Sequence, residues 1–63
     1  MYTVYIARGT RTETIAEESD PELAELTVVR LANPQGEPVK TCNGQEWTLA
    51  EGWRIGIERS TEE

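Results

Sequence analysis

Cys42 is the only cysteine in this 63-residue chain, and this limits how the fold can be held together. An intramolecular disulfide is impossible, and a structural zinc site would need about four Cys or His ligands in a chain without histidine. A domain this small buries only about 60% of its unfolded surface. We therefore expect one apolar core, a single compact domain over residues 1–59 and a polar tail over 60–63.

The absence of histidine also narrows the chemistry of the chain. Histidine-based acid–base catalysis, a Ser–His–Asp triad and a Cys–His pair are excluded by composition. The sequence contains neither a GxGxxG motif nor a P-loop, and its acids do not follow the EF-hand spacing. We expect a protein that is not an enzyme and that has no cofactor, no catalytic residue and no metal site.

Hydropathy predicts where the protein is found. No window of about 18 apolar residues exists, so no membrane span is expected. The first residues lack the basic region and the long apolar run of a secretory signal. With a single cysteine, the composition favours a reducing compartment, and we expect the cytoplasm.

Alternating β-branched and aromatic residues predict strands at both ends of the chain. Residues 2–8 alternate, Arg8-Gly9-Thr10-Arg11 forms a plausible turn, and residues 12–16 are a weaker return strand. Near the C-terminus, Asn43-Gly44 is a strong two-residue hairpin signal because both residues tolerate positive φ. Further strands are expected over 45–49 and 53–59, joined by a turn at 50–52.

The middle of the chain has two interpretations. Ser19 or Asp20 can cap a helix that has Pro21 in its first position. The β-branched residues at 27–29 then favour a strand over 26–32, paired with 37–42 through a Pro-Gly turn.

The preferred fold class is mostly β or small α+β: about five antiparallel strands, as a sheet or small partly open barrel, with one short helix near residues 20–26. The alternative is an α+β fold in which a longer helix over 20–32 packs on three or four strands.

The largest side chains are candidates for the core. Trp47 and Trp53 share strand faces with Leu or Ile, so we expect them to be buried, and Cys42 is expected to be a small packed residue. Tyr2 and Tyr5 lie on opposite faces of the first strand, so at least one should be exposed and available to a partner.

The net charge of −6 is localised in the middle of the chain. Residues 12–29 hold six carboxylates and no base, and residues 30–61 are balanced. If 18–26 is helical, Glu18, Glu22 and Glu25 form one stripe that can imitate the phosphates of a nucleic-acid strand. The predicted partner-binding residues are Glu13, Glu17, Glu18, Asp20, Glu22, Glu25 and Tyr5.

No motif identifies a family. In size and charge alone, the chain resembles the small acidic inhibitors that phages and mobile elements encode, among them anti-CRISPR proteins and DNA mimics. This resemblance implies a non-enzymatic module, monomeric or homodimeric, that occupies a basic, nucleic-acid-binding surface of a partner protein. We expect neither direct nucleic-acid binding nor membrane association. The alternative is a structural or accessory subunit, such as a virion or complex component, that oligomerises through a sheet edge.

Overall fold

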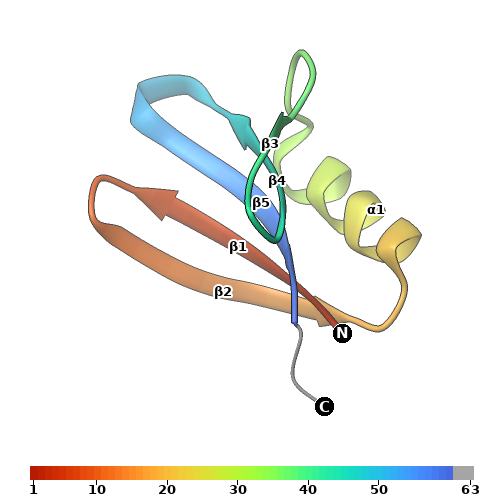
Figure 1. Ribbon diagram of the computed structural model, residues 1–63. Coiled ribbons are helices and arrows are strands. Elements are labelled where there is room, and N and C mark those ends of the chain that lie inside the picture. The colour runs from red at the N-terminus through yellow and green to blue at the C-terminus, as the bar shows by residue number, and fades with distance from the viewer. Residues whose placement is uncertain (61–63) are drawn as a thin grey trace.

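A computed structural model describes residues 1–60 of the chain (Figure 1). In chain order its elements are β1 (Tyr2–Arg8), β2 (Arg11–Glu18), α1 (Pro21–Ala32), β3 (Val39–Lys40), β4 (Gly44–Thr48), a 3-10 turn η1 (Ala50–Gly52) and β5 (Trp53–Arg59). The expected strand over 53–59 is confirmed. Of the predicted polar tail over 60–63, residues 61–63 lie outside the described part.

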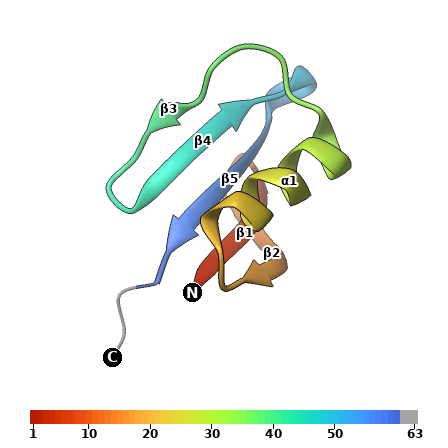
Figure 2. The same cartoon turned by 90° about the vertical axis from the view of Figure 1, so that its right-hand side faces the viewer.

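The five strands form one antiparallel sheet in the order β2-β1-β5-β4-β3. The helix α1 lies across one face of this sheet and leaves the other face open (Figures 1 and 2). The expected five-stranded antiparallel sheet with one helix is therefore confirmed. The sheet is not closed into a barrel, because β2 and β3 do not pair with each other and remain its edges.

The prediction of a strand over 26–32 is wrong, because these residues continue the helix. Three features of the structure explain why the β-branched residues at 27–29 stay helical. Val28 is completely buried against the sheet, Thr27 Oγ1 donates to the carbonyl oxygen of Leu23 at 2.9 Å, and Asn33 ends the helix in the left-handed conformation. Tertiary burial thus outweighs the modest helix penalty of Thr and Val.

The start of the helix is as expected. The side chain of Asp20 accepts a hydrogen bond of 2.9 Å from the backbone N–H of Glu22, and Pro21 occupies the first turn. At the other end, the N–H of Asn33 donates to the carbonyl oxygen of Val29 at 2.9 Å, just before Pro34. The helix therefore runs to residue 32, beyond the expected end at 26.

Two turns show what glycine does in this fold. The Arg8–Arg11 turn is confirmed, and the positive φ of Gly9 (61°), without one at Thr10, fits a type II′ hairpin. The prediction that Asn43 and Gly44 are the two central residues of a hairpin turn is wrong. Thr41 N–H donates to the Gly44 carbonyl at 3.0 Å, and Gly44 already lies in β4, where a Cβ would overlap the carbonyl oxygen of Ile57.

The return strands also differ in length from the prediction. The strand β2 extends to residue 18, and Ile15 is an extra residue opposite the Val4/Tyr5 step of β1. The strand β3 contains only two residues of the predicted 37–42. One edge of the sheet is therefore long and bulged, and the other is very short.

The core lies between α1 and the sheet. Its buried members are Val4, Ala24, Val28, Ile55 and Ile57. Tyr2, Ala16, Ala32, Trp47 and Leu49 pack around them as partly buried neighbours. This core is small and one-sided, so the rest of the sheet is available for other contacts.

Candidate functional site

The open face of the sheet carries a polar contact that spans three strands. The hydroxyl of Tyr5 in β1 donates a hydrogen bond of 2.8 Å to Glu46 in β4. Gly56 of β5 lies between them in register, and a Cβ there would overlap the Tyr5 ring. The ring therefore lies flat over the backbone of Gly56, which allows its hydroxyl to reach Glu46.

This contact changes the acidity of the tyrosine. Burial, the hydrogen bond to Glu46 and the negative charges of Glu46 and Glu58 raise the pKa of Tyr5 to about 12. Arg54 lies at 4.0 Å from Glu46 and opposes this shift. Because its hydroxyl is already bonded to Glu46, Tyr5 joins β1 to β4 across the open face.

The predicted acidic residues are distributed over several surfaces. In β2, Glu13 and Glu18 lie opposite Ile6 and Tyr2, on the face that carries α1. Glu17 lies opposite Thr3 and so projects from the open face. Tyr5 also lies on the open face, so of the predicted acids in β2 it shares a face only with Glu17. The structure therefore does not bring the seven predicted residues together in one site.

The helical acids lie on more than one side of α1. Because α1 begins at Pro21, Glu18 belongs to β2, and the single stripe of Glu18, Glu22 and Glu25 is not formed. Glu18 accepts a 3.2 Å hydrogen bond from Thr27, whereas Glu25 accepts one of 3.2 Å from Gln45 of β4. Glu18 and Glu25 therefore lie on opposite flanks of the helix.

The outer side of α1 is partly apolar. Leu23, Leu26 and Val29 are exposed to 47%, 46% and 51%. At 3.6 residues per turn, Leu26 and Val29 alternate with Glu22 and Glu25 along one side of α1, and Glu25 lies at the border of this side, where it reaches Gln45 of β4. We call Glu22, Glu25, Leu26 and Val29 the outer face of α1. Neither Glu22 nor Glu25 makes an ion pair within residues 1–60.

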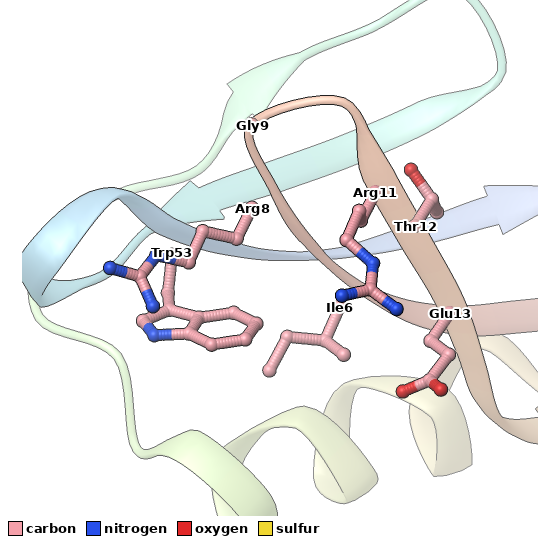
Figure 3. Close-up of a pocket in the computed structure, with 7 residues that line it drawn as sticks. All are labelled: Ile6, Arg8, Gly9, Arg11, Thr12, Glu13 and Trp53. Atoms are coloured by element: carbon pink, nitrogen blue, oxygen red, sulfur yellow. The ribbon is translucent and has the colours of Figure 1, made fainter.

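A cleft of about 700 Å³ opens on the helix-bearing face of the sheet, at the β1–β2 hairpin (Figure 3). Its walls include Ile6, Arg8, Arg11, Thr12, Glu13 and Trp53, and we call it the arginine cleft. Trp53 and Ile6 form its floor, and the guanidinium carbon of Arg8 lies 5.2 Å from the centre of the Trp53 ring.

Arg54 links this cleft to the open face. Its Nη2 donates a hydrogen bond of 3.0 Å to the carbonyl oxygen of Gly9 at the hairpin tip. Arg8, Arg11 and Arg54 thus converge on one end of the sheet, while Arg59 pairs with Tyr2 at the other end. The hairpin tip is the most basic part of an otherwise acidic molecule.

The expectations for Trp and Cys are met only in part. Both tryptophans are only partly buried: Trp47 packs against the core, whereas Trp53 lines the arginine cleft. Cys42 is exposed, so its predicted packed position is wrong: it lies in the β3–β4 turn, away from α1.

Residues 1–60 contain neither a cluster of metal ligands nor a helix suited to crossing a membrane. No group of three or more Cys, Asp or Glu side chains in this part of the chain is arranged to hold a metal ion. Among the described helices, none is long and apolar enough to span a membrane.

Two features of these surfaces were not predicted from the sequence. The exposed apolar side chains of α1 were not predicted, because residues 26–32 were expected to form a strand. The 3.6-residue period of a helix would have placed Val28 and Val29 on different sides. The arginine cleft was missed because Trp53 was assigned to the core. Its signal was the type II′ hairpin, which places Arg8 and Arg11 opposite each other.

No protein-family model, curated protein or solved structure matches the chain.

Proposed function

We propose that this protein is a non-enzymatic binding module that uses the outer face of α1 to occupy a basic groove on a partner protein. The observation that supports this most is the pairing of carboxylates with exposed apolar side chains. Glu22 and Glu25 alternate with the exposed Leu26 and Val29, and neither glutamate has a salt-bridge partner within residues 1–60. A helix with such a face fits a groove with an apolar floor and a basic rim.

The charge distribution supports a basic partner. Glu18 and Asp20 come directly before α1 and Glu22 lies in its first turn, so carboxylates gather at the helix N-terminus. Such a patch raises the rate of association with a basic surface and makes binding sensitive to salt. The proposal includes an inhibitor that covers a nucleic-acid-binding surface of its partner in the cytoplasm, as phage-encoded DNA mimics do.

The arrangement of the acids does not favour a single stripe that imitates the phosphates of a nucleic-acid strand. Since Glu18 and Glu25 lie on opposite flanks of α1, the acids surround the helix start and do not form one row of phosphate-like charges. Recognition would then depend on the combination of carboxylates with Leu26 and Val29. A partner that recognises only charge spacing fits this surface less well.

The alternative, a subunit that oligomerises through a sheet edge, has less support. The long free edge is β2, and its bulge at Ile15 interrupts the regular pattern that another strand would need. Glu13, Glu17 and Glu18 along the same strand oppose pairing with a second copy. The other edge, β3, has only two residues.

The test is capture of partners from host-cell lysate by the immobilised protein, at low and high salt, with identification by mass spectrometry. The Glu22→Lys/Glu25→Lys variant should lose the partners of the wild type. The control Glu37→Lys/Glu58→Lys changes the net charge equally but lies outside the outer face, and it should keep them.

Circular dichroism must show that both variants remain folded. The captured proteins should carry basic surfaces, should dissociate as salt rises, and should be displaced by duplex DNA if the surface binds nucleic acid. Equal capture by both variants, or capture that salt does not weaken, would contradict the proposal.

A further inference from the structure

The arginine cleft is a second surface, at the opposite end of the sheet from the acidic start of α1. Arg11 and Glu18 are the two ends of the eight-residue strand β2, which is about 25 Å long at 3.3 Å per residue. We propose that the arginine cleft binds an acidic peptide segment in which a bulky apolar side chain is flanked by carboxylates. This inference does not depend on the function proposed for α1.

The two arginines of the cleft are available for a carboxylate ligand. Arg8 and Arg11 lie opposite each other across the β1–β2 hairpin, on the face that carries α1. Neither makes a salt bridge or a side-chain hydrogen bond within residues 1–60. A guanidinium binds a carboxylate through two parallel N–H donors, so the pair can hold two acidic side chains of a peptide.

The floor of the cleft is suited to an apolar side chain. Ile6 and Trp53 also line the adjoining hollow, which continues below the last turn of α1 to Leu31 and Leu49. Leu31 is 59% exposed there, although it belongs to a helix that otherwise packs on the sheet. An apolar side chain between Trp53 and Leu31 would remove both from water, as the central anchor of an interface does.

Arg8 itself is partly positioned for this role. Its guanidinium lies beside the Trp53 ring, which restricts its conformations and leaves its N–H edge available (Figure 3). Arg54, through its hydrogen bond to Gly9, holds the hairpin that carries both arginines. We assign Arg54 as a positioning residue, since it does not line the cleft.

A peptide fits the charges of the cleft better than a nucleic acid does. Glu13 lines the arginine cleft and Glu51 lines the adjoining hollow, so a continuous phosphate backbone would meet carboxylates on both sides. Nucleic-acid strands are bound by extended basic grooves with stacking aromatics. Here two arginines face one tryptophan, which matches two or three side chains of an acidic peptide.

The experiment is a nuclear magnetic resonance titration of the full chain with a short capped peptide that has a central phenylalanine flanked by glutamates. The matched probe replaces these glutamates with glutamines, and a short oligothymidylate is the third probe. We expect the glutamate peptide to shift the Trp53 indole N–H and the methyl signals of Ile6 and Leu31. The glutamine peptide should bind about tenfold more weakly, because the charge-assisted contacts are lost.

The variant Arg8→Gln/Arg11→Gln should weaken binding of the glutamate peptide by about tenfold or more. Arg30→Gln/Arg59→Gln removes the same charge away from the cleft and should leave binding within about twofold of the wild type. Thermal unfolding of each variant separates loss of binding from loss of fold. Equal binding of both peptides, equal loss in the control variant, or tighter binding of oligothymidylate would overturn the inference.

Discussion

The hydroxyl of Tyr5 donates a 2.8 Å hydrogen bond to Glu46, although the two residues are 41 positions apart and lie on strands that are not neighbours. Gly56, on the strand between them, makes this possible because it has no side chain beneath the Tyr5 ring. The contact connects the two halves of the sheet on the face that no helix covers.

Removing the hydroxyl should therefore weaken the whole sheet. We expect Tyr5→Phe to lower the free energy of unfolding by about 1 kcal/mol, since the bond has a charged acceptor but is partly exposed. Urea denaturation followed by circular dichroism measures this difference. Tyr2→Phe is the matched control, since no side-chain hydrogen bond of Tyr2 is present within residues 1–60, and a loss as large in this control would contradict the assignment.

The raised pKa of Tyr5 predicts a loss of stability in alkali. The neutral phenol is favoured in the folded protein, so the unfolded chain releases this proton first as the pH rises. Its contribution is complete below pH 10 and is lost as the pH rises from 10 to about 12. Titration of tyrosinate absorbance in Tyr2→Phe isolates Tyr5, and a midpoint near 10 would show that the hydrogen bond is absent in solution.

The two strand glycines should respond differently to alanine. At Gly44 the new Cβ meets the backbone carbonyl of Ile57, which cannot move without breaking β4–β5 pairing, so Gly44→Ala should cost about 3 kcal/mol. At Gly56 the nearest atoms belong to the Tyr5 ring, which can swing away, so the loss should be about 1 kcal/mol. In Gly56→Ala the pKa of Tyr5 should also return toward 10. Equal losses in the two variants would be inconsistent with this geometry.

Adjacent valines test the helix directly. Val28 is fully buried and Val29 is 51% exposed, so Val28→Ala should lower the free energy of unfolding by about 2 kcal/mol. Val29→Ala should change it by less than about 0.5 kcal/mol, because the site is on the surface and alanine favours helix. Thermal or urea unfolding compares the pair. A reversed order would mean that residues 26–32 do not form this helix.

Asp20 allows capping to be separated from charge. Asp20→Ala removes the acceptor for the Glu22 N–H and should cost about 1 kcal/mol, whereas Asp20→Asn keeps an acceptor and should cost much less. If the helix start also contributes to partner binding, Asp20→Asn should weaken capture from lysate without unfolding the protein. Comparable destabilisation by both changes would show that the carboxylate charge, and not the cap, supports the helix.

Much of the fold could be predicted from local patterns. Apolar and polar residues alternate in Trp53–Arg59 and in Tyr2–Arg8, which predicts one core-facing side for each strand. Val4, Ile55 and Ile57 are on these sides and are buried. The Asp20 cap and the Gly9 turn act within a few residues, so they were also visible in the sequence. The acidic segment could be read from the sequence, whereas its division between β2 and α1 could not.

The sequence alone determined that no intramolecular disulfide can hold this chain, that its acids are concentrated before residue 30, and that its outer segments are strands. Only the tertiary structure decided that residues 26–32 are helical, because the burial of Val28 against Val4 and Ile57 outweighs the local preference of β-branched residues for strands. The same packing decided which side chains remain outside. Since α1 covers only part of one sheet face, Trp53 stays accessible beside Arg8, and Leu26 and Val29 face away from the core.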